Sequence, residues 1–258
     1  MLKQALRIGR GLQNMGFLQS VAYKMHRVRT RFLREARPYT LRSRYAKYPL
    51  YCRPRTTDVQ VFSQIFVGRE YRCLDDIRHA EFIVDCGANV GYSSAYFMSA
   101  YEDAHVIAIE PDPGNFDALV RNLQPFGDRV QAIRSAVWPE PVDLVFAEDT
   151  RGEGLEWARR VRIAREHETE TIKGIDLSTV LKNSGHDRIS ILKIDIEGGE
   201  LALFSRGYEE WLPQVDCLVI ELHGPECEAV FNRAISGQGF AVTSCDELTV
   251  CSAPVTGR

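Results

Sequence analysis

The chain has 258 residues, of which 45% are hydrophobic, and a formal net charge of −3. This length and apolar content suffice for one large α/β domain with a full core. No run approaches the roughly 18 consecutive apolar residues that a membrane-spanning helix needs. The seven cysteines include no Cys-x-x-Cys pair, which argues against a zinc site. Their odd number and the lack of a signal-peptide pattern favour a reducing compartment, so we expect a cytoplasmic protein.

The charge is distributed unevenly, because residues 1–57 carry fourteen Lys or Arg against a single acid, Glu35. Such a segment indicates an anionic partner. Residues 1–37 also carry a broken apolar stripe, which predicts a helix. It could lie on an anionic membrane, at the inner face, or pack on the domain or a second copy of the chain; nucleic acid is disfavoured. We therefore predict a basic helical N-terminal extension, residues 1–57, and a domain over residues 58–258.

The first regular pattern in the domain is a strand, a glycine turn and a helix. Residues 82–84 form a short apolar run, rich in β-branched side chains, that predicts a buried parallel strand ending at Asp85. Gly87 and Gly91 then predict a tight turn, because glycine allows a positive φ and lets the backbone approach a ligand closely. Residues 92–101 predict the helix that follows, whose N-terminus offers free N–H groups.

The spacing of these residues favours one kind of ligand. Asp85-x-Gly87-x-x-x-Gly91 differs from the G-x-G-x-x-G fingerprint of dinucleotide sites. A carboxylate ahead of the first glycine would repel a pyrophosphate, but it could bind a cationic amino group. A second strand, over residues 105–110, ends in Glu110, which can accept hydrogen bonds from ribose hydroxyls. The pattern therefore predicts a nucleoside that carries an amino acid, which is S-adenosylmethionine (SAM).

The rest of the chain continues the alternation of strands and helices. The expected elements are a helix over residues 111–123, a strand over 130–137, a β-hairpin excursion with strands over 142–146 and 161–171, a short helix over 175–182, a strand over 189–196, a helix from residue 200, a strand over 215–222, a helix over 225–236, and a closing hairpin over 240–245 and 248–251. This order predicts a Rossmann-like α/β fold, with a mostly parallel sheet and an antiparallel C-terminal strand.

Three motifs carry a resemblance to a known family. Residues 84–91 are Val-Asp-Cys-Gly-Ala-Asn-Val-Gly, residues 109–111 are Ile-Glu-Pro, and residues 192–200 are Leu-Lys-Ile-Asp-Ile-Glu-Gly-Gly-Glu. Together they resemble the FkbM family of class I SAM-dependent methyltransferases, over roughly residues 60–245. The resemblance implies the class I methyltransferase fold, SAM as cofactor, and a hydroxyl acceptor on a sugar, a glycolipid or a related metabolite.

The motifs also indicate which residues contact SAM. We expect the cofactor-binding residues to be Asp85, Gly87, Ala88, Asn89, Gly91, Glu110, Pro111, Ser135, Ala136 and Asp195. The resemblance places Ser135 and Ala136 where related enzymes contact the adenine, and Asp195 near the methionine moiety.

Four further side chains stand at the ends of two later strands. Asp195 and Glu197 end one strand, while Glu221 and His223 end the next. Side chains two residues apart share a face of a strand, and ligands of open α/β sheets bind at the carboxyl ends of the strands. If the two strands are neighbours, the four side chains lie together at one rim of the sheet. Grouping charged side chains in apolar surroundings costs free energy, so such a cluster indicates a functional role.

Two purposes for this rim stay open. One is general base catalysis, with His223 as the leading base and Glu197 as the next. The other is a divalent metal such as Mg²⁺, with Asp195, Glu197, Glu221 or His223 as ligands. Either purpose fits a SAM-dependent O-methyltransferase. The alternative is a non-catalytic Rossmann-like adaptor that binds an anionic membrane through its N-terminus, and the acid-rich rim speaks against it.

Overall fold

The structure is a computed structural model that describes residues 37–147 and 160–254. The helix expected over residues 1–37 lies outside the described residues apart from Arg37, so its role stays a prediction. None of the helices in the described ranges has both the length and the apolar content that crossing a bilayer requires.

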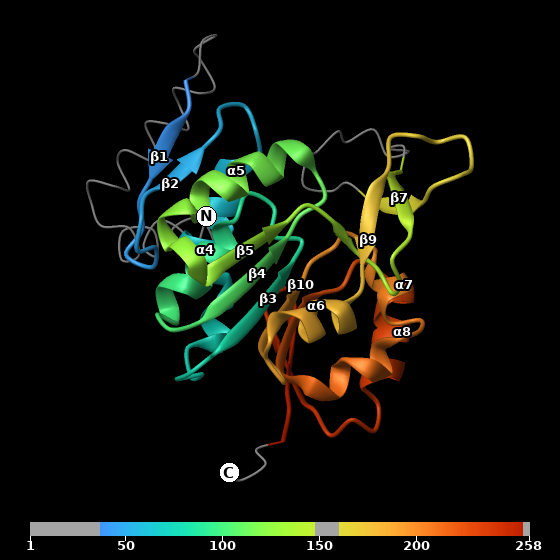
Figure 1. Ribbon diagram of the computed structural model, residues 1–258. Coiled ribbons are helices and arrows are strands. Elements are labelled where there is room, and N and C mark those ends of the chain that lie inside the picture. The colour runs from blue at the N-terminus through green and yellow to red at the C-terminus, as the bar shows by residue number, and fades with distance from the viewer. Residues whose placement is uncertain (1–36, 148–159, 255–258) are drawn as a thin grey trace, which may run out of the picture.

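A seven-stranded sheet forms the centre of the domain (Figure 1). Its strands are β3 (Phe82–Cys86), β4 (His105–Ile109), β5 (Val130–Ile133), β10 (Ile189–Ile194), β11 (Val215–Glu221), β12 (Ala241–Cys245) and β13 (Leu248–Ser252). They lie in the order β12-β13-β11-β10-β3-β4-β5. The five strands from β11 to β5 are parallel, and β13 and β12 complete the edge in antiparallel pairing. This is the predicted Rossmann-like sheet: β12 and β13 form the expected closing hairpin, and β13 is the strand that runs antiparallel to β11.

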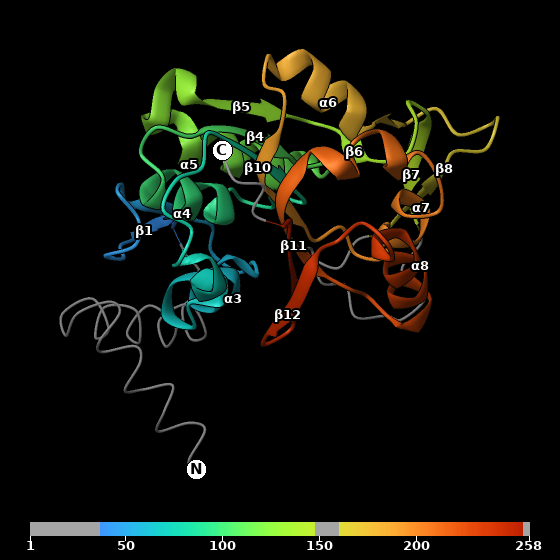
Figure 2. The same cartoon turned by 90° about the horizontal axis from the view of Figure 1, so that it is seen from below.

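Helices cover both faces of the parallel strands, which explains their continuous apolar sequences. The helices are α4 (Tyr92–Ala100), α5 (Pro113–Leu123), α6 (Leu177–Ser184), α7 (Glu200–Leu203) and α8 (Pro225–Ile235), with short 3-10 turns η3 (Gln124–Arg129), η4 (Tyr208–Glu210) and η5 (Leu212–Gln214). From β3, Ile83 enters the core cluster with α4 and α5, whereas Phe82 and Val84 enter the cluster with α6 and α8. Figure 2 shows α6 and α4 on opposite sides of the sheet.

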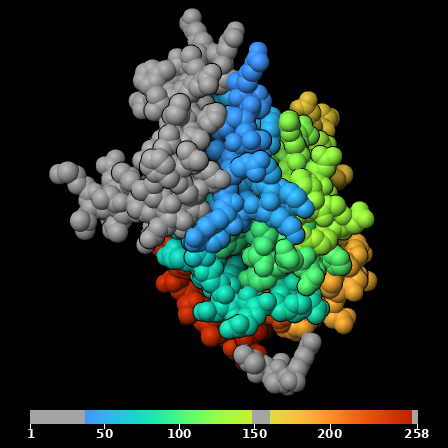
Figure 3. Space-filling view, turned by 90° about the vertical axis from the view of Figure 1, so that its left-hand side faces the viewer, coloured from blue at the N-terminus to red at the C-terminus, as the bar shows by residue number. Residues whose placement is uncertain are grey.

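Residues 37–74 form a layer over α4 and α5. This layer contains the hairpin β1 (Tyr39–Leu41) and β2 (Leu50–Cys52), α3 (Asp58–Phe62), the π-helix η1 (Ser63–Val67) and the 3-10 helix η2 (Glu70–Leu74). Figure 3 shows its first part, in blue, lying against the residues coloured green. Leu50, Phe62 and Phe66 are fully buried there. The expected division at residue 57 stays a prediction, although the Arg53–Asp58 ion pair crosses it at 2.8 Å.

A second sheet lies beside the main one, and two of the expected strands, those over residues 130–137 and 161–171, differ in extent from the strands observed. It consists of β6 (Ala136–Val137), β7 (Asp143–Phe146), β8 (Val161–Ile163) and β9 (Ile172–Ile175), in the order β6-β9-β7-β8. The strand expected over residues 130–137 was wrong in extent, because β5 leaves the main sheet at Ile133. The Ser135 hydroxyl then donates to the carbonyl of Lys173, and the chain joins β9.

The strand expected over residues 161–171 was also too long. The Glu168 carboxylate binds Arg162 and the N–H of Arg165, and these bonds form a turn after β8. The helix expected from residue 175 starts two residues later, because Asp176 caps it by accepting a hydrogen bond from the N–H of Thr179 at 2.7 Å. Part of the expected hairpin excursion, residues 148–159, lies outside the described ranges.

Gly87 and Gly185 have nearly the same positive φ. A comparison of alanine substitutions at the two positions tests how closely the turn after β3 approaches the end of β10. Gly87 has φ +75°, and a Cβ there would lie 1.8 Å from the carbonyl oxygen of Asp195. Gly185 has φ +76° with no atom within 4 Å of a Cβ. We expect Gly185→Ala to lower the free energy of unfolding by about 1–2 kcal/mol through backbone strain alone. Gly87→Ala should cost at least about 3 kcal/mol, because steric overlap adds to that strain. Urea unfolding measures both, and equal losses would contradict the close approach.

Candidate active site

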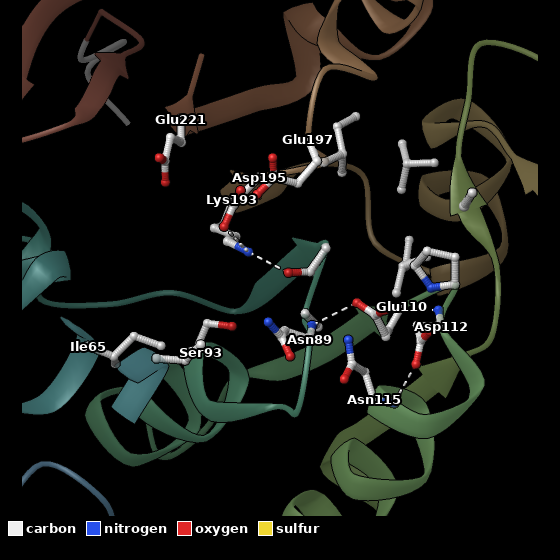
Figure 4. A pocket seen from close by; sticks show the side chains of 18 of the residues that line it. Ile65, Asn89, Ser93, Glu110, Asp112, Asn115, Lys193, Asp195, Glu197 and Glu221 are labelled. Atoms are coloured by element: carbon white, nitrogen blue, oxygen red, sulfur yellow. Dashed lines mark hydrogen bonds and ion pairs between the residues drawn. The ribbon is translucent and has the colours of Figure 1, made fainter. Parts of the chain in front are cut away.

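A pocket opens at the carboxyl ends of the parallel strands (Figure 4). One wall comes from the ends of β3, β4, β10 and β11, and the facing wall from α3, η1 and η2. The expected cofactor residues that line it are Gly87, Ala88, Asn89, Glu110, Pro111, Ser135, Ala136 and Asp195. Asp85 and Gly91 were also expected there, but they lie behind the lining.

The turn after β3 brings backbone to the pocket. The N–H groups of Gly87 and Ala88 donate to the carbonyl of Ile109, at 3.0 and 2.9 Å. Asn89 follows with a left-handed φ of +50° and lines the pocket. Gly91 has a different role, because a Cβ there would lie 3.2 Å from side chains of α5. It therefore allows the start of α4 to pack closely on α5, away from any ligand.

Glu110 is fixed at the end of β4. Its Oε2 accepts the N–H of Asn89 and its Oε1 accepts the N–H of Asp112, both at 2.9 Å. Burial raises the pKa of Glu110 to about 7, although these two hydrogen bonds act in the opposite direction. The carboxylate thus reaches the pocket in one orientation and keeps further acceptor capacity for a ligand's hydroxyls.

Asp85 lies beneath the pocket and forms a buried ion pair. Its Oδ1 is 3.2 Å from the Nζ of Lys193, and its Oδ2 accepts hydrogen bonds from the hydroxyls of Ser93 and Ser94 at 2.6 Å. The two residues are register partners on β3 and β10, so their side chains lie on the same side of the sheet. Asp85 is fully buried. Asp85 was expected to meet the amino group of a ligand directly, but it is fully buried, paired with Lys193 and outside the pocket lining, whereas Lys193 lines the pocket.

Lys193 has its hydrogen-bonding capacity occupied within the protein. It donates to the carbonyl oxygens of Gly87 at 2.7 Å and Cys86 at 3.3 Å, and lies 3.7 Å from Asp195 Oδ2. Burial alone would lower the pKa of Lys193, but Asp85 and Asp195 more than offset it and raise the pKa above the ordinary value. Lys193 is therefore a fixed cation in the pocket floor.

The four rim residues meet as the sequence predicted, because β10 and β11 are neighbours. The Nε2 of His223 lies 3.8 Å from Asp195, 3.5 Å from Glu197 and 3.9 Å from Glu221. Glu197 reaches this position through a left-handed φ of +49°, a strained conformation for a residue other than glycine. The three carboxylates line the pocket, and His223 lies beside them.

Sequence reasoning missed the residue that holds His223. Nδ1 of His223 lies 2.9 Å from Oε1 of Glu200, which is fully buried at the start of α7. Glu200 is three residues from Glu197 in the Lys-Ile-Asp-Ile-Glu-Gly-Gly-Glu block, and that spacing was the available signal. Glu70 and Glu247 also line the pocket, and no motif indicated them.

The rim carries more negative than positive charge. The pKa values of Glu197 and Glu221 are raised to about 7, chiefly by burial and also by the neighbouring carboxylates, while His223 acts in the opposite direction. Burial would lower the pKa of His223, yet the hydrogen bond to Glu200 and the surrounding carboxylates raise it to about 9. In the described ranges, Asp195, Glu197 and His223 also place ligand atoms within 4.8 Å of one another, which is compatible with a metal ion.

The sheet order, the glycine turn after β3 and the acid at the end of β4 define a Rossmann-like class I methyltransferase. The Methyltransferase FkbM domain matches residues 85–243, and the chain belongs to this family. It is therefore a methyltransferase, and the family implies SAM as the methyl donor.

The chain is similar to several proteins that are named methyltransferases. It is 27% identical to Methyltransferase sdnD of Sordaria araneosa over 217 residues, which are 71% of this chain and 82% of that protein. It is 23% identical to the hexuronic acid methyltransferase AglP of Haloferax volcanii over 150 residues, 58% of this chain and 59% of that protein. The crystal structure of Methyltransferase FkbM from Methylobacillus flagellatus aligns with a TM-score of 0.47 and 18% identity, over 67% of this chain and 43% of that chain.

Removing the cation in the pocket floor tests the buried ion pair. Lys193→Met leaves the fully buried Asp85 without its cationic partner, so we expect the free energy of unfolding to fall by about 3–5 kcal/mol. The double variant Asp85→Asn/Lys193→Met should lose less than the sum of its single variants. Lys47→Met is the matched control, because Lys47 pairs with exposed Glu102; it should change stability little. Near wild-type urea unfolding of Lys193→Met would contradict the assignment.

Proposed function

We propose that the protein transfers the methyl group of SAM to a hydroxyl of a sugar, a glycolipid or a related metabolite, with His223 as the general base. The observation that carries this proposal is the 2.9 Å contact between His223 and buried Glu200 beside the pocket. It leaves Nε2 facing the acidic rim, where an acceptor hydroxyl would lie.

Three features of the pocket fit SAM. Gly87 lacks a Cβ where the chain turns into the pocket. Glu110 presents an oriented carboxylate for ribose hydroxyls. Ser135 and Ala136, where β6 begins, line the pocket where the adenine is expected. When bound, SAM supplies an electrophilic methyl group on a positively charged sulfur. Acidic walls suit a ligand with that charge.

The residues of the rim then have separate roles. As the acceptor oxygen bonds to the methyl carbon, Nε2 of His223 takes the hydroxyl proton. Glu200 accepts a hydrogen bond from Nδ1 and stabilises the imidazolium that forms. Asp195, Glu197 and Glu221 can accept hydrogen bonds from neighbouring hydroxyls of a sugar. The name of one relative, a hexuronic acid methyltransferase, supports a sugar acceptor.

Two further roles stay proposals. A divalent metal such as Mg²⁺ could bind Asp195, Glu197 and His223, with Glu221 nearby, and orient a sugar diol. Contact of the N-terminal extension with the inner membrane face would bring the enzyme to a lipid-linked acceptor, whereas contact with a second copy of the chain would make it an oligomer.

The ribose assignment is tested by Glu110→Ala. This change removes the carboxylate expected to bind the ribose hydroxyls, so SAM affinity measured by calorimetry should fall about 10- to 100-fold. Asp117→Ala on the exposed side of α5 is the control and should bind SAM as the wild type does. Unchanged affinity of Glu110→Ala would remove Glu110 from the cofactor site.

The base assignment is tested by His223→Ala. This variant should still bind SAM, while methyl transfer from labelled SAM to a crude extract of glycans and glycolipids falls about 10²- to 10⁴-fold. Full activity would exclude His223 as the base. The same assay after dialysis against EDTA separates the two roles of the rim, because a base mechanism predicts no loss.

The pH profile provides a second readout of this assignment. The base must be neutral, and the pKa of His223 is raised to about 9 in the free protein, so kcat/KM should rise with pH toward that value. Glu200→Gln removes the closest charge that raises this pKa. Its rising limb should therefore move to lower pH, and its kcat should fall because the imidazolium loses its partner. An unmoved profile would mean that Glu200 does not act on His223.

A further inference from the structure

The burial of Asp85 leaves the amino group of the donor without its expected partner. The methionine moiety of SAM carries an ammonium group, and a carboxylate is the natural partner for it. Asp85 is fully buried and held by Lys193, Ser93 and Ser94. Another acid of the pocket is therefore the candidate partner for the ammonium.

The sheet order shows where that end of the donor lies. Glu110, the expected ribose partner, stands at the end of β4, and β3 separates β4 from β10. A ligand that extends from Glu110 across the Gly87 turn arrives at Lys193 and Asp195. Figure 4 shows Glu110 on one side of Asn89, and Lys193 with Asp195 on the other. The methionine end therefore lies over β3 and β10.

Glu70 comes to this end of the pocket from the facing wall. It is the first residue of η2, and Arg69 before it has a left-handed φ of +56° that turns the chain. Tyr71 beside it is buried against Tyr96 and Phe97, which fixes the position of η2. The Glu70 side chain lines the pocket and accepts a hydrogen bond from the Gln64 amide.

The charges around Glu70 call for a cation. The pKa of Glu70 is raised to about 7, chiefly by burial and also by the charges of Asp195 and Glu247, while Gln64 and Lys193 act in the opposite direction. Lys193 is already bound by Asp85 and by two carbonyl oxygens. Among the described residues, no Lys or Arg forms an ion pair with Glu70 or Glu247. An ammonium group between Glu70 and Asp195 would supply the missing positive charge.

We propose that Glu70, together with Asp195, binds the ammonium group of the donor's methionine moiety, and that Asp85 acts only through Lys193. This inference rests on SAM being the donor in the proposed function. It assigns a specificity-determining contact to η2, a segment that lies upstream of the residues matched by the FkbM domain.

Three related ligands test this contact. SAM carries both the sulfonium and the ammonium, S-adenosylhomocysteine carries only the ammonium, and 5′-methylthioadenosine carries neither, because it lacks the whole amino-acid part. We expect Glu70→Gln to weaken SAM and S-adenosylhomocysteine by about tenfold or more in calorimetry, because the ammonium loses a charged partner. Binding of 5′-methylthioadenosine should stay unchanged, which also shows that the variant is folded.

Two controls separate contact from general charge. Glu110→Ala should weaken all three ligands, because all three contain the ribose. Glu247→Gln removes another carboxylate from the same pocket and should have a clearly smaller effect than Glu70→Gln on S-adenosylhomocysteine.

Each remaining result would overturn the inference. Equal weakening of 5′-methylthioadenosine would make Glu70 a structural part of the wall, and loss for SAM alone would place it at the sulfonium. If Glu70→Gln and Glu247→Gln weakened binding equally, Glu70 would act only through long-range electrostatics and not by direct contact. Unchanged binding of all three ligands to Glu70→Gln would exclude a contact between Glu70 and the ammonium. A wild-type protein that binds none of them would instead overturn the proposed function itself.

Discussion

The buried ion pair between Asp85 and Lys193 is the constraint on which the site depends. It joins β3 to β10 at the point where both strands end, and Lys193 also binds the two carbonyl oxygens that begin the glycine turn. The turn, the end of β10 and the pocket floor are thus held by one cation. Two buried charges of this kind are costly unless they satisfy each other, so neither residue can be replaced alone without loss.

The second organising feature is the excess of carboxylates around the pocket. Glu70, Asp195, Glu197 and Glu221 line it, while the Lys193 charge is used inside the floor. In the free protein, burial together with this arrangement raises the pKa of Glu70, Glu197 and Glu221 to about 7, and the carboxylates raise that of His223 to about 9. A donor with a positive charge would relieve this repulsion. It would also lower the pKa of His223, so binding of the donor would itself prepare the base.

Local sequence patterns predicted the parts of the fold that local physics decides. The apolar runs of β3, β10 and β11 and the strand-end positions of Asp195 and His223 were correct, because alternation and buried parallel strands leave a clear signal. The break between β5 and β6 was missed, since it depends on a hydrogen bond from Ser135 to the distant Lys173. The burial of Asp85 beside Lys193 was missed for the same reason, because its lysine partner is far along the chain. Glu70 carried no signal, since it reaches the pocket from the opposite wall.

The pocket wall that faces the glycine turn affects where the boundaries of the catalytic domain should be drawn. It is built from α3, η1 and η2, all of which precede the region that the family match covers. A catalytic unit cut at residue 85 would retain the sheet's later strands and most of the acidic rim, yet the wall built from α3, η1 and η2 would be missing. Domain borders drawn from sequence similarity alone would therefore exclude residues that line the pocket.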